Sequence, residues 1–104
     1  MRIHFERTGG FAGIRMTATV NTESLSSEEA RDLHEMVEAA RFFDLPAVIT
    51  TAAPGADRFR YKLTVEAEGR RHTVEMGEAA VPEALRPLLQ RLTAVARSAR
   101  HSDG

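Results

Sequence analysis

The chain has 104 residues, of which 42% are hydrophobic and 28% charged, a composition that excludes disordered and fibrous proteins and allows one modest core. A formal net charge of −1 gives no overall attraction to nucleic acid or acidic membranes, and no apolar run approaches the roughly 20 residues of a membrane-spanning helix. The absence of cysteine excludes disulfides and fits a reducing compartment, so we expect one cytoplasmic domain over residues 1–100, with a frayed tail over residues 101–104.

The first 20 residues predict a β-hairpin. Apolar and polar side chains alternate over residues 1–7 and again over residues 14–20, which is typical of strands with one buried face. The connection at residues 9–13 contains three glycines, which supply the positive φ angles that a tight reversal needs. Phe11 lies at the centre of this segment, where polar residues are usual.

A capped amphipathic helix follows. Ser26 and Glu29 have the spacing of a capping box, so the helix should begin at Ser27. Apolar residues then recur at three-to-four spacing, and the opposite face is acidic. Because Pro46 lacks a backbone donor and disfavours helical backbone before it, the helix should end within residues 42–44.

The second half of the chain repeats the order of strand, strand and helix. Residues 47–49 are expected to form a short extended piece, and residues 58–67 alternate more clearly than any other segment. A turn at residues 68–69 leads into a further strand at residues 71–76. Together these segments predict a second hairpin.

The last element is a helix with a continuous apolar stripe that begins near Pro82. Because Pro87 lies inside this segment, either residues 82–86 form a separate turn or the helix is kinked. The order ββαββα predicts an α+β fold, a four-stranded, largely antiparallel sheet with both helices on one face. The open face of that sheet would carry Arg2, Arg15, Arg58, Arg60, Lys62 and Arg71 against Glu6, Glu66 and Glu75.

The sequence contains no recognisable catalytic, metal or cofactor site. No two of its four histidines have the spacing of a zinc pair on one helix, and His72 should pack on the core side of its strand. Capping explains Ser26 and Ser27, so a nucleophilic serine has no support. Phe59 and Tyr61 also fall on the core side rather than among the basic residues, which argues against an RNA-binding sheet. A protein that binds another protein is therefore favoured over an enzyme.

Five segments resemble the emfourin family, and together they span nearly the whole chain. They are RTGGFAGIR at 7–15, AARFFDLP at 39–46, RFRY at 58–61, RHTV at 71–74 and PEALRPL at 82–88. The resemblance implies a small bacterial protein that inhibits a thermolysin- or protealysin-like zinc metallopeptidase by stoichiometric binding, without a cofactor, so that the active-site cleft is blocked. The alternatives are a protein-binding module that does not inhibit and, more distantly, a nucleic-acid-binding protein.

The residues expected to contact the partner belong to two groups. The glycine-flanked tip would offer Phe11 as an apolar anchor, although this side chain could instead fold back onto the core. Basic residues of the open sheet face would steer an acidic partner. The predicted contact residues are Gly9, Gly10, Phe11, Ala12, Gly13, Arg58, Arg60 and Lys62.

Overall fold

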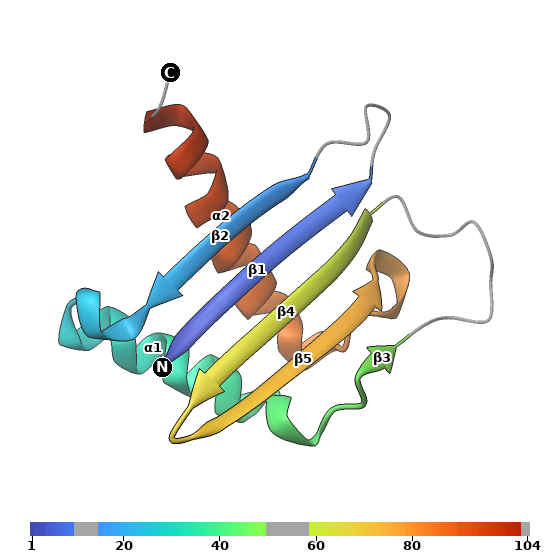
Figure 1. Cartoon of the computed structure of the whole chain (residues 1–104), viewed down its shortest axis with the longest axis horizontal. Helices are drawn as coiled ribbons and strands as arrows, with labels where there is room; N and C mark the ends of the chain where they lie inside the picture. Colours follow the sequence, from blue (N-terminus) through green and yellow to red (C-terminus); the bar gives the residue numbers. More distant parts are fainter. Residues whose placement is uncertain (10–14, 50–58, 103–104) are drawn as a thin grey trace.

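The computed structural model describes residues 1–9, 15–49 and 59–102, which form an α+β fold. Figure 1 shows a twisted sheet with both helices on the same side of it. The sheet order is β2-β1-β4-β5-β3. The elements are β1 (Arg2–Gly9), β2 (Met16–Asn21), α1 (Ser27–Ala39), β3 (Val48–Ile49), β4 (Phe59–Ala67), β5 (Arg70–Gly77) and α2 (Arg86–Ser102).

The sheet differs from the expected one in having five strands and mixed pairing. The fifth strand, β3, runs parallel to β5, with Val48 opposite Glu75 and Ile49 opposite Met76. The Glu75 amide also donates a hydrogen bond of 2.8 Å to the Ala47 carbonyl. The extended piece predicted at residues 47–49 is confirmed, but a strand of two residues is too short for side-chain alternation to show that it joins a sheet.

The four longer strands pair antiparallel with one another, as predicted, and each has one face toward the helices. On that face, β1 and β4 contribute Ile3, Phe5, Leu63 and Val65, none of which has any exposed surface. The opposite face is open and polar. The hydrophobic effect of this one-sided core is therefore what holds α1 and α2 on the sheet.

The predicted capping box of α1 is present, but the helix ends earlier than predicted. The Glu29 amide donates to the Ser26 hydroxyl at 3.2 Å. The helix ends at Ala39, because Arg41 adopts a left-handed conformation with φ 50° and ψ 48°. This reversal starts a separate 3-10 helix, Phe42–Asp44, and brings the Phe42 ring into the core.

A separate turn precedes the second helix, which is one of the two predicted arrangements. Glu83–Leu85 forms a 3-10 helix, and α2 begins at Arg86, directly before Pro87. Helical backbone continues to Ser102, so it includes the first two residues of the predicted tail. Among the described helices, none is long and apolar enough to cross a membrane.

We predict that Arg41→Gly stabilises the protein by about 0.5–1 kcal/mol. A left-handed conformation costs an L-residue roughly 1–2 kcal/mol, and glycine avoids this cost. Part of the gain is offset, because glycine loses more conformational entropy when the chain folds. Urea unfolding measures the difference. The matched control is Arg31→Gly at an exposed position inside α1, which should lose about 1 kcal/mol. Equal losses in both variants would contradict the prediction.

Candidate partner-binding site

The two groups of residues proposed for partner contact meet at one end of the sheet. Gly9, the last residue of β1, is the cross-strand partner of Phe59, the first residue of β4. Two positions further along the strands, a row of cross-strand partners extends from Arg7 through Tyr61 and Met76 to Ile49 in β3. Figure 1 shows this common end, where β1 ends and β4 begins. The topology therefore places the start of the predicted tip and the basic residues of β4 at one end of the sheet.

Several predicted contact residues lie outside the described part of the chain, and their role remains a prediction. They are Gly10, Phe11, Ala12, Gly13 and Arg58. Gly9 is described and has φ 116°, a conformation that residues with side chains rarely adopt. A glycine is therefore required where β1 leads into the predicted tip.

Aromatic contacts fix the scaffold at this edge. The Arg7 guanidinium lies 4.4 Å from the centroid of the Phe59 ring, within the range of cation–π attraction. Two residues further from the sheet end on each strand, the rings of Phe5 and Tyr61 pack with centroids 6.1 Å apart. Both contacts join β1 to β4 on the helix side. The base from which the predicted tip extends is thus a packed structure.

The two described cations of the predicted site, Arg60 and Lys62, differ in their electrostatic surroundings. Both belong to the open face of β4 and are exposed. In the strand register, Lys62 lies between Glu6 and Glu75, whereas the neighbours of Arg60 are Thr8 and Gly77. Acidic neighbours reduce the positive potential around Lys62. Arg60 is therefore the stronger candidate for attracting an acidic partner.

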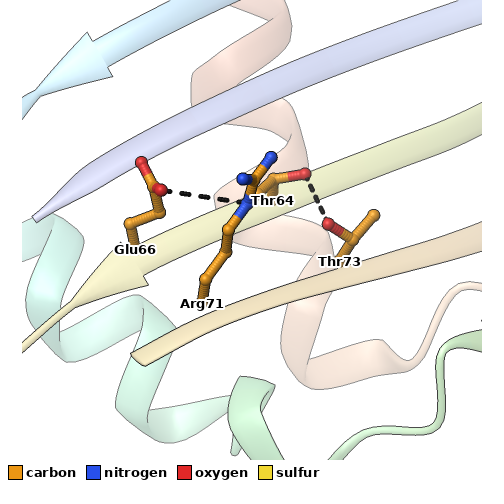
Figure 2. Close-up of polar contacts among 4 residues, drawn as sticks. All are labelled: Thr64, Glu66, Arg71 and Thr73. Carbon is orange, nitrogen blue, oxygen red and sulfur yellow. Dashed lines mark hydrogen bonds and ion pairs between the residues drawn. The ribbon is translucent and has the colours of Figure 1, made fainter. Parts of the chain in front are cut away.

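The remainder of the open face is mixed in charge rather than uniformly basic. Figure 2 shows Glu66 facing Arg71, with 3.8 Å between a carboxylate oxygen and the guanidinium Nε. Beside this pair, the hydroxyls of Thr64 and Thr73 are hydrogen-bonded at 2.8 Å. The ion pair is exposed, so it contributes little stability. Such a face is typical of a solvated surface, and among its described strand residues Arg60 is the cation without an acidic cross-strand neighbour.

His72 is confirmed as a packed, locally bonded residue. Its Nε2 lies 2.7 Å from the Leu45 carbonyl oxygen, which can only accept, so Nε2 carries the proton. The ring also packs edge-to-face with Phe42, with centroids 5.5 Å apart, and in a tilted arrangement with Phe43 at 6.5 Å. This histidine fixes the turn after α1 against β5. In the described ranges, no group of three or more His, Asp or Glu side chains is placed to hold a metal ion.

Sequence reasoning missed the position of Arg7. The apolar residues Ile3 and Phe5 set the helix-facing register of β1, and Arg7 continues that register. The sequence already shows a cation, Arg7, at a position where the alternation of β1 calls for an apolar residue. This signal could have predicted that the helix side of the sheet end contributes to the site.

The comparisons with known proteins identify a family. A family model described as Emfourin matches residues 5–93, which is most of the chain. Neither the comparison with curated proteins nor that with solved structures gave a match. Emfourins are an inhibitor family, so the expectation that the chain is not an enzyme is confirmed. The chain belongs to the Emfourin family.

Proposed function

We propose that this protein inhibits a thermolysin- or protealysin-like zinc metallopeptidase by binding it one to one and blocking its active-site cleft. The observation that carries the proposal is the family match over residues 5–93. The fold supports it, because an inhibitor needs a rigid scaffold that presents a contact segment with little loss of conformational entropy on binding. The protein would act in the cytoplasm on a peptidase of the same cell.

The sheet end supplies the contact surface in this proposal. The glycine-rich tip would enter the cleft, with Phe11 in an apolar subsite of the peptidase, while Arg60 would face acidic groups at the rim of the cleft. Gly9 and Phe59 are paired in the sheet, so the origin of the tip is fixed relative to the core. Binding energy gained by the tip is then not lost in ordering the scaffold.

We predict stoichiometric inhibition without added metal. Increasing amounts of the protein should reduce cleavage of a peptide substrate by a protealysin-like peptidase linearly, to an endpoint near one equivalent. Excess zinc should not restore activity, because the protein blocks the cleft and does not remove the metal. Full activity in a stable one-to-one complex would instead favour the non-inhibitory binding module.

We predict that Phe11→Ala weakens inhibition about 30-fold and leaves the unfolding midpoint nearly unchanged. Truncating a buried aromatic anchor costs about 2 kcal/mol of binding energy. The control is Phe5→Ala, which removes a fully buried ring and should cost about 3–5 kcal/mol of folding stability. A Phe11→Ala protein that melts much earlier but inhibits normally while folded would place this ring in the core.

We predict that Arg60→Glu slows association with the peptidase more than Lys62→Glu does. Both substitutions reverse one exposed charge on β4, but Lys62 already lies between two glutamates. Stopped-flow association at low and high salt measures the difference. Steering charges change the association rate more than the dissociation rate, and salt should reduce the effect. Identical association rates for the two variants would contradict the prediction, because they would show that the acidic neighbours of Lys62 do not reduce its attraction for the peptidase.

A further inference from the structure

A charged groove lies on the helix side of the sheet end, between the sheet and α2. Its volume is about 400 Å³, within the range of pockets that hold ligands. The α2 side of the groove is one helical stripe, because its residues recur at spacings of three and four. The residues that matter here are Arg7, Tyr61, Arg86, Gln90, Thr93 and Arg97.

Two of the three arginines occupy positions that folding does not favour. Arg7 continues the apolar register of β1, and Arg86 is the first residue of α2, where the helix dipole disfavours a cation. The ion pairs of Arg15 with Glu6 and of Arg71 with Glu66 lie outside the groove. Departures from local preference of this kind are expected at functional sites. Arg7 also packs on the Phe59 ring, so Arg86 is the arginine whose position is least explained by stability and best explained by a ligand.

The charges define the ligand chemically. Three guanidinium groups and one carboxylate, that of Glu78, line the groove, whereas the whole chain has a net charge of −1. Guanidinium groups bind carboxylates with paired, charge-assisted hydrogen bonds. The groove therefore suits an anionic ligand rich in carboxylates.

The spacing of the arginines sets the length of that ligand. Arg86 and Arg97 are eleven positions apart on one helix, which corresponds to roughly 16 Å along its axis. An extended peptide covers this distance with about five residues. One small anion cannot reach both ends, whereas a peptide segment with acidic residues toward each end can.

We propose that this groove binds an extended acidic segment of the inhibited peptidase, as a second contact beside the cleft. The proposal rests on the proposed function for the source of the segment. Continuity supports it, because Arg7 is two residues from Gly9, where the predicted tip begins, and Tyr61 lies between the predicted contact residues Arg60 and Lys62. A second copy of this chain that offered its acidic α1 is the alternative occupant, and sedimentation tests it below.

The first experiment titrates the whole protein with the peptide Glu-Glu-Gly-Gly-Glu-Glu and follows amide chemical shifts by NMR. We expect saturable shifts in β1 and α2 that weaken with salt, and little binding of the peptide with Gln in place of Glu. The double variant Arg86→Gln/Arg97→Gln should bind at least fivefold more weakly. The matched control, Arg31→Gln/Arg91→Gln, removes the same charge away from the groove and should bind normally. Equal weakening in both variants, or no saturable binding, would overturn the acidic-peptide site.

The second experiment measures inhibition of the peptidase by the same variants. The groove variant should have at least a fivefold higher inhibition constant than the control variant. If both variants inhibit like the parent, the groove proposal is overturned while the proposed function stands. If the parent itself does not inhibit, the proposed function is lost, and with it the peptidase as the source of the segment. The peptide titration then still decides the ligand class.

Sedimentation of the parent and the groove variant, without peptidase, tests whether a second copy of this chain occupies the groove. A monomeric parent agrees with the proposal. Self-association that disappears in Arg86→Gln/Arg97→Gln would assign the groove to a second copy and overturn the proposal.

Discussion

The pairing of β1 with β4 is the constraint on which the rest of the structure depends. This antiparallel ladder extends from Arg2 opposite Glu66 to Gly9 opposite Phe59 and lies at the centre of the sheet. The two strands are far apart in sequence, so forming the ladder closes a long loop and requires compensation from burial. The fully buried side chains on its helix side supply that compensation. The same register fixes where the predicted tip begins and where Arg60 and Lys62 lie relative to it.

Much of the fold could be predicted because side-chain alternation is local information. The long strands, the start of α1 and the turn before α2 all follow from periodicity and from capping residues or proline. The parallel edge strand β3 could not be predicted, because two residues carry no period and its partner is distant. The end of α1 was missed for another reason: Arg41 accepts a left-handed conformation that is usual for glycine, and burial of Phe42 holds it there.

Less of the candidate site could be predicted, because a site depends on which elements meet. The alternation that placed Arg60 and Lys62 on the open face could not show that their cross-strand neighbours differ, since register is set by tertiary pairing. The position of Arg7 was accessible from the alternation alone, but its meaning depends on α2. Only the packed structure brings Arg7 together with Arg86 and Arg97, which lie about 80 residues or more further along the chain.

The two cationic features lie on opposite faces of the same sheet end. Arg60 belongs to the open face of β4, and Arg7 belongs to the helix side of the neighbouring strand, one position from the cross-strand partner of Arg60. At physiological ionic strength the Debye length is about 8 Å, so charges this close to one edge act on an approaching partner together. A flat partner surface could touch only one face of the sheet. A partner that contacts both faces must enclose the end of the sheet, as the two walls of a cleft would.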